Sequence, residues 1–98
     1  MTERQITPQT FEVLSWLMVK PGSAGAEICR GTSLPSGTVY PILSRLEEGG
    51  WLYSQWEPGD PTALGRPRKR FYTVTAKGAA RARDTAAHFA GLAARFAT

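Results

Sequence analysis

The sequence contains one cysteine and one histidine among its 98 residues. Cys29 alone excludes an internal disulfide and a cysteine-rich zinc site, and His88 alone excludes a metal site built from several histidines. No nucleophile–base pair and no phosphate-binding loop stands out, so we expect no enzymatic activity, no metal and no cofactor. We expect the protein to reside in the reducing cytoplasm, with Cys29 acting as a small core residue.

Long hydrophobic runs are also missing. None approaches the ~20 apolar residues that a membrane-spanning helix requires. The chain opens on the polar Thr2–Gln5, and no apolar segment with a small-residue cleavage site follows. We therefore expect neither a signal peptide nor contact with a membrane.

Charged residues make up only 20% of the chain and apolar residues 42%, a balance typical of a globular domain. A chain of this length supports a single hydrophobic core. The 12 basic and 8 acidic residues leave a formal net charge of +4. Residues 1–50 carry four basic and five acidic side chains, whereas residues 51–98 carry eight basic and three acidic ones. This basic excess in the second half favours a polyanionic partner.

The first helix is predicted to start at Thr7-Pro8 and to end at Pro21-Gly22, because threonine caps helices and proline suits their first position. Its apolar stripe follows helical spacing: Phe11, Leu14, Leu17 and Met18. Trp16 lies on the other side of this helix. It is either an aromatic at the edge of the core or part of a surface for a partner or ligand.

A short second helix is predicted over Ser23–Arg30, capped by Ser23, with Ile28 and Cys29 facing inward. The third helix is predicted over Ser36–Glu48, and its buried stripe has helical spacing: Val39, Ile42, Leu43 and Leu46. The opposite face is small and polar: Gly37, Tyr40, Pro41 and Ser44, flanked by Thr38 and Arg45. Because proline removes a backbone hydrogen bond, Pro41 is expected to bend the first turns.

Two strands are predicted over Trp51–Glu57 and Lys69–Thr75, since both segments are rich in aromatic and β-branched residues. The residues between them hold three prolines and two glycines, which favours a mobile hairpin loop. The loop ends on a basic run, Gly65 to Arg70, in which four of six residues are cationic. Arg70 lies inside the strand register and is alternatively expected to extend its charged end to solvent along the sheet or to pair locally.

A last helix is predicted over about Ala76–Ala97, with Thr75 as its cap. Small and aromatic residues follow a heptad spacing along it, and one leucine broadens the seam: Ala82, Ala86, Phe89, Ala93 and Phe96, with Leu92. The seam either packs on the first helix or joins two copies of the chain. We favour a homodimer, because the seam is long for so small a domain. The remaining polar residues are expected on the ordinary helix surface: Lys77, Arg81, Arg83, and the Asp84/His88 pair.

Three helices, a hairpin and a final helix describe a mainly α (α+β) fold, the winged helix-turn-helix, with a two-stranded wing. We expect a DNA-binding domain over residues 1–75 and a C-terminal dimerisation helix over residues 76–98. In such a fold the third helix enters the major groove and the hairpin touches the backbone or the minor groove. Double-stranded DNA is therefore the expected partner, held at the wing by phosphate contacts that weaken with salt.

Two motifs support this reading. The segment from Thr38 to Gly50 resembles the third-helix signature of PadR-like transcriptional regulators, Thr-hydrophobic-Tyr-Pro-hydrophobic-Leu-x-x-Leu-Glu-x-x-Gly. The segment from Gly65 to Thr75, with Gly78 after it, resembles the wing and second strand of that family. In the second helix, Gly25-Ala26-Glu27-Ile28 lacks the tyrosine that the family often has. The single short C-terminal helix resembles the small subclass of the family.

The resemblance implies a dimeric DNA-binding repressor whose C-terminal helix supplies the dimer contact. It implies operator contacts from the third helix and the wing: Ser36, Gly37, Thr38, Tyr40, Ser44, Arg66, Arg68 and Lys69. It also implies that some relatives are released from DNA by phenolic acids or other flat hydrophobic compounds.

Three hypotheses follow. The leading one is a sequence-specific regulator, a homodimeric repressor on a palindromic operator. The second adds a small aromatic effector, bound in a pore between protomers that Trp16 lines together with Phe89 or Phe96. The third is a winged-helix module that binds protein and no operator.

Overall fold

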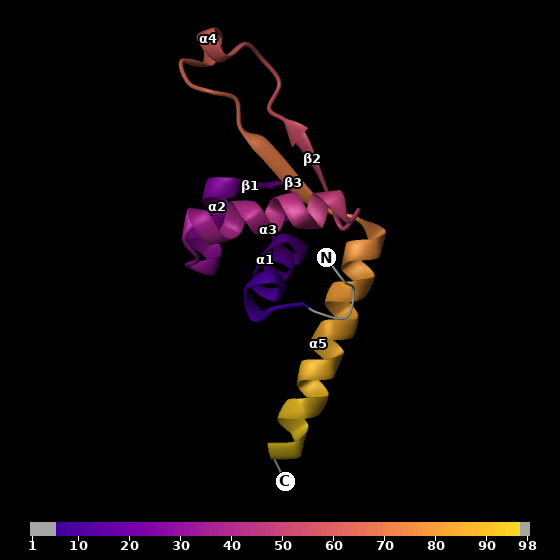
Figure 1. Ribbon diagram of the computed structural model, residues 1–98. Helices are drawn as coiled ribbons and strands as arrows, with labels where there is room; N and C mark the ends of the chain where they lie inside the picture. Colours follow the sequence, from indigo (N-terminus) through magenta and orange to yellow (C-terminus); the bar gives the residue numbers. More distant parts are fainter. Residues whose placement is uncertain (1–5, 97–98) are drawn as a thin grey trace.

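The computed structural model describes residues 6–96 (Figure 1). Two features of the sequence lie outside these residues, namely the polar Thr2–Gln5 and Ala97, the last residue of the predicted final helix. Along the chain the elements are α1 (Pro8–Val19), β1 (Ser23–Ala24), α2 (Gly25–Thr32), α3 (Ser36–Glu48), β2 (Leu52–Trp56), α4 (Pro61–Leu64), β3 (Arg70–Val74) and α5 (Ala76–Phe96). The mainly helical architecture with a small sheet is the predicted winged helix-turn-helix.

The core lies where α1, α2 and α3 meet the sheet and the first turns of α5. Its fully or almost fully buried members are Val13, Leu14, Leu17, Ile28, Val39, Ile42, Leu43, Leu46, Trp51, Leu52, Tyr72 and Ala82. The third helix has the predicted bounds, and its four predicted core positions are all buried. In α1 the buried face is turned from the predicted stripe, because Thr10 and Val13 are buried while Phe11 is only half-buried. Thr10 tolerates burial because its hydroxyl accepts a hydrogen bond from the Thr7 hydroxyl at 2.9 Å.

The start of the second helix differs from the prediction. Ser23 does not cap it, because Ser23 and Ala24 form the short strand β1, which pairs with Tyr72 and Phe71 of β3. The helix instead begins at Gly25, and the carboxylate of Glu27 accepts a hydrogen bond from the Ala24 N–H at 3.2 Å. The Ser23 hydroxyl donates to the Lys20 carbonyl and accepts the indole N–H of Trp16 at 3.1 Å. Cys29, predicted to face inward, is half-buried against the core.

The wing consists of β2, α4 and β3. The strands pair antiparallel from Leu52 opposite Val74 to Trp56 opposite Arg70, and the sheet order is β1-β3-β2. Each strand is one residue shorter at both ends than predicted. The loop between them contains the short helix α4, which the sequence reading did not expect. Asp60 caps it by accepting the Thr62 N–H at 3.1 Å, and Gly65 ends it with φ of +71°, a conformation that favours glycine.

The last helix, α5, runs beside α1 and then continues past the rest of the molecule, at the opposite end from the wing (Figure 1). Its first turns are part of the core, since Gly78 and Ala82 are buried. A Cβ at Gly78 would collide with the carbonyl oxygen of Trp51, so glycine is required for this close approach. Further along, Phe89 packs edge-on against Phe11 with ring centroids 5.4 Å apart. Within residues 6–96, no helix combines the length and apolar character needed to cross a membrane.

Candidate nucleic-acid interface

The outward face of α3 is formed by small and hydroxyl-bearing residues. Ser36, Gly37, Tyr40 and Ser44 are exposed and Thr38 is half-buried, so all five predicted contacts from this helix lie at or near the surface. A Cβ built on Gly37 would have no atom within 4 Å, so this side of the helix is open. The face can therefore approach another molecule closely and offer hydroxyl groups to it.

Tyr40 is positioned by the neighbouring helix α2. Its side chain is 46% exposed, yet a Cβ on Gly25 would lie only 2.5 Å from the Tyr40 hydroxyl oxygen. The missing side chain at Gly25 thus leaves the space in which the phenol ring rests. The ring is fixed on one side by α2 and open to solvent on the other.

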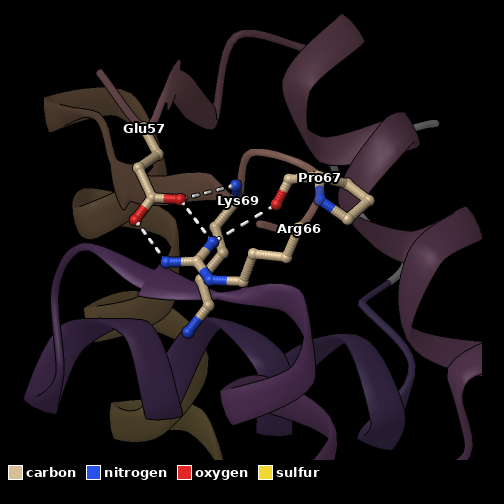
Figure 2. Close-up of polar contacts among 4 residues, drawn as sticks. All are labelled: Glu57, Arg66, Pro67 and Lys69. Carbon is tan, nitrogen blue, oxygen red and sulfur yellow. Dashed lines mark hydrogen bonds and ion pairs between the residues drawn. The ribbon is translucent and has the colours of Figure 1, made fainter. Parts of the chain in front are cut away.

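A salt bridge closes the wing near its distal end (Figure 2). The guanidinium of Arg66 donates to both carboxylate oxygens of Glu57, at 2.6 Å and 2.9 Å, and also to the Pro67 carbonyl at 3.2 Å. The same carboxylate accepts the backbone N–H of Lys69 at 3.2 Å. The hydrogen bonds from Arg66 and Lys69 lower the pKa of Glu57 to about 2, and the pairing raises the pKa of Arg66. We call these contacts the wing clasp.

The clasp changes the interpretation of Arg66. The sequence predicts that Arg66 contacts DNA, but its terminal nitrogens are already bound to Glu57 and to a carbonyl. The shared carboxylate of Glu57 joins Arg66 to the backbone at Lys69. All three predicted wing contacts are exposed, but within residues 6–96 only Arg66 is engaged in an ion pair, whereas Arg68 lies against Trp56.

Arg70 pairs locally, the alternative that its place in the strand suggested. Its Nε donates to the Ser54 hydroxyl at 2.7 Å, and its Nη2 lies 3.3 Å from a carboxylate oxygen of Glu47. The Ser54 hydroxyl in turn donates to Glu47 at 2.6 Å. Since Glu47 belongs to the last turn of α3, these bonds connect the wing to the third helix.

Sequence reasoning missed Trp56. Its side chain is 55% exposed, and its ring lies against two guanidinium groups, with the Cζ of Arg68 5.6 Å and that of Arg70 5.2 Å from the centroid. The sequence carried no sign of this exposure, because strand alternation puts Trp56 on the same face as the buried Leu52.

An open hollow of about 350 Å³ lies between the wing, α2 and α3. Its lining combines cations, aromatic rings and the start of α2: Ala24, Gly25, Ala26, Tyr40, Trp56, Arg68, Lys69, Arg70 and Tyr72. Burial raises the pKa of Tyr72 above its ordinary value. The hollow carries positive charge and donors, which suits a phosphate backbone running between the helix and the wing.

The predicted dimer seam on α5 is only partly free. Ala82 is 5% exposed because it packs in the core of its own chain, so its assignment to a dimer contact is corrected. Phe89 is 40% exposed and rests on α1, whereas Phe96 is 88% exposed. The other members are exposed or half-buried: Ala86, Leu92 and Ala93. The exposed seam therefore begins after the first two turns of the helix.

The three predicted ligand residues do not come together within one chain. Trp16 lines a groove of about 370 Å³ between α1 and α2, and its ring lies where a side chain at Gly31 would be. Phe89 lines a different groove of about 630 Å³ beside α5. Phe96 is among the lining residues of neither groove. Trp16 itself is half-buried at the edge of the core.

Comparisons with solved structures show the same fold. PcaV of Streptomyces coelicolor is 22% identical over 95% of this chain and 64% of its own, with a TM-score of 0.82. BpsR of Bordetella bronchiseptica is 20% identical over 97% of this chain and 67% of its own, with a TM-score of 0.79. A PadR family transcriptional regulator of Eggerthella lenta is 24% identical over 90% of this chain and 77% of its own, with a TM-score of 0.74.

The present chain spans between 64% and 77% of the length of these three structures, and 56% of a MarR family regulator. No curated protein sequence matches it significantly. The model of the Transcriptional regulator PadR-like family matches residues 25–84, more than half of the chain.

Proposed function

Because this chain belongs to the Transcriptional regulator PadR-like family, we propose that it is a sequence-specific repressor that binds a palindromic operator as a homodimer. The observation that carries the proposal is the common surface of α3 and the wing. The hydroxyl-bearing face of α3 adjoins a hollow to which the wing contributes Arg68 and Lys69. The groups proposed to recognise DNA bases, on α3, are thus neighbours of those proposed to bind phosphates, on the wing, but are separate from them.

In this proposal α3 enters the major groove and reads base edges with Tyr40, Ser44 and the hydroxyls near its start. The adjacent phosphates enter the hollow, where Arg68 and Lys69 neutralise them and Trp56 packs against the sugars. Arg66 acts through the wing clasp as a positioning residue. This assignment of base recognition to α3 and phosphate binding to the wing is supported by the distribution of charge. The centre of α3 exposes no cation, whereas the wing beside it is basic.

The homodimer is supported by the free end of α5. Phe96 is a large apolar residue that is 88% exposed, and Ala86 and Ala93 lie on the same seam. Contiguous exposed apolar surface is typical of association sites, and these residues are the candidates for one on α5. We propose that residues after Ala82 pack on the same region of a second copy, while the first turns of α5 complete the core of their own chain.

A small effector is also part of the proposal. The solved structure of BpsR is described in terms of regulation of its DNA binding by 6-hydroxynicotinic acid, and PcaV was solved in complex with its natural ligand. These statements concern those two proteins. They support the proposal that this chain is likewise released from DNA by a small aromatic compound.

Selection of bound sequences from a random DNA pool, at two salt concentrations, tests the function. A palindromic consensus is expected, with binding that weakens at the higher salt. Recovery of no consensus at either concentration would overturn operator binding. If a protein partner is then bound equally well after Arg68→Gln and Lys69→Gln, the chain is a protein-binding module instead.

A further inference from the structure

One face of the wing changes from the core to the surface along its length. Residues opposite one another in β2 and β3 point to the same side of the sheet, and on this face they are Leu52 with Val74, Ser54 with Tyr72, and Trp56 with Arg70. Leu52 is buried in the core, whereas Trp56 at the far end is 55% exposed and lines the hollow between the wing, α2 and α3. Packing in the core therefore does not explain the position of the Trp56 ring.

Trp56 is held in place by Arg70. The Cζ of Arg70 lies 5.2 Å from the centroid of the indole ring, which is the range of a cation–π interaction. Arg70 is itself fixed, because its Nε donates to the Ser54 hydroxyl at 2.7 Å and its Nη2 lies 3.3 Å from the carboxylate of Glu47. The charge of Arg70 is thus balanced by Glu47, and the ring is connected through Arg70 to the last turn of α3.

Arg68 is the second cation over this ring, and its charge is not balanced. Its Cζ lies 5.6 Å from the ring centroid. Its side chain forms neither a hydrogen bond nor an ion pair with the residues that the structure describes. A guanidinium over an aromatic ring uses its face for that contact and keeps the N–H groups in its plane for acceptors such as phosphate oxygens. The ring therefore restrains Arg68 at the hollow and leaves its donors available.

Such a restraint affects how tightly an arginine binds. Ordering a long side chain at an interface costs binding free energy, and a side chain that is already ordered in the free protein avoids that cost. We propose that Trp56 is a positioning residue, which holds the guanidinium of Arg68 at the hollow before DNA binds. The inference rests on the proposed function in one respect, namely that a DNA phosphate enters the hollow. It differs from the wing clasp, which acts on the backbone at Lys69.

A double-mutant cycle on binding to duplex DNA of random sequence tests this role. Random sequence is sufficient because phosphate contacts do not depend on the bases. Trp56→Leu should weaken binding about two- to tenfold for each wing, which is the cost of ordering one long side chain. In the Arg68→Gln background the same change should have a smaller effect, because no guanidinium remains to be held. Any contact of the ring with the sugars is common to both backgrounds and cancels from the coupling.

Two further variants distinguish positioning from a structural role. Trp56→Phe keeps an aromatic face and should recover most of the loss. Tyr53→Leu is the matched control, because Tyr53 is a 48% exposed aromatic on the opposite face of the same strand and should leave the affinity unchanged. Trp56→Leu removes no charge, so the salt dependence of binding should be retained, whereas Arg68→Gln should reduce it.

The contact itself is measured by NMR in the free protein, which needs no variant that folds poorly. The ring current of the indole should shift the δ-methylene signals of Arg68 upfield, and Trp56→Leu should return them to ordinary values. Unshifted Arg68 signals, additive losses in the cycle, or an equal loss with Tyr53→Leu would each overturn the proposal. A palindromic consensus from operator selection together with additive losses would refute positioning alone. Coupling in the cycle without a consensus would refute operator binding alone.

Discussion

Salt dependence distinguishes the wing residues that contact phosphate from the one that positions them. The logarithm of DNA affinity falls with the logarithm of salt concentration, with a slope of about −0.9 for each phosphate neutralised. A dimer that loses one contact in each protomer should therefore lose about 1.8 units of slope. We expect this loss for Lys69→Gln and for Arg68→Gln, because both side chains are exposed.

The double variant Glu57→Gln/Arg66→Gln should behave differently. The guanidinium of Arg66 lies 2.6 Å from the Glu57 carboxylate, so its charge is already balanced within the wing. Removing both partners leaves the net charge unchanged. We expect a slope close to that of the original protein, together with weaker binding at every salt concentration, because the turn that carries Lys69 loses its support.

Fluorescence anisotropy of a labelled operator duplex, titrated between about 50 and about 200 mM salt, measures these slopes. Circular dichroism of each variant confirms that the helices are retained. A double variant that loses as much slope as Lys69→Gln would show that Arg66 neutralises a phosphate directly. The assignment of Arg66 as a positioning residue would then be refuted.

Three further predictions concern the dimer, the recognition helix and the wing clasp. Phe96→Glu should convert the proposed dimer to a folded monomer, because Phe96 is 88% exposed in the single chain; a dimer that persists in sedimentation would place the interface elsewhere. Gly25→Ala should lower the preference for operator over random DNA by about 1 to 3 kcal/mol, because the added methyl displaces the Tyr40 ring. Competition binding measures this preference, and an unchanged ratio of the two affinities would contradict the role of Tyr40. The pKa of Glu57 is lowered from 4.5 to about 2, so the stability that it contributes is complete above pH 4.5 and is lost as the pH falls toward 2; a carboxyl titration by NMR with a midpoint near 4.5 would show that the clasp does not form in solution.

The third helix could be predicted to the residue because its determinants are local. Four apolar residues at helical spacing fix its buried face, and Gly49 follows its last residue. The start of α2 could not be predicted in this way. Ser23 pairs with Tyr72, which lies 49 positions further along the chain, and no local pattern reveals that partner. The two-residue strand depends on the tertiary fold.

In the candidate site, too, features fixed by local sequence could be predicted and features that depend on the tertiary fold could not. The basic run and the exposed hydroxyls were visible as composition, and of the predicted residues Tyr40, Arg68 and Lys69 line one hollow. The pairing of Arg66 with Glu57 was not visible, because it depends on how α4 closes the loop between the two residues. Ala82 was assigned to the dimer seam because a heptad spacing does not reveal which neighbour a position meets.

The bonds that join Glu47, Ser54 and Arg70 have a mechanical consequence. They connect the last turn of α3 to the middle of the wing, so they oppose a change in the angle between helix and hairpin. In the proposed operator complex, this cross-link holds the distance between the major-groove and backbone contacts of one half-site. In the proposed dimer, tolerance for a different half-site spacing would then come from bending or rotation where the two copies of α5 meet.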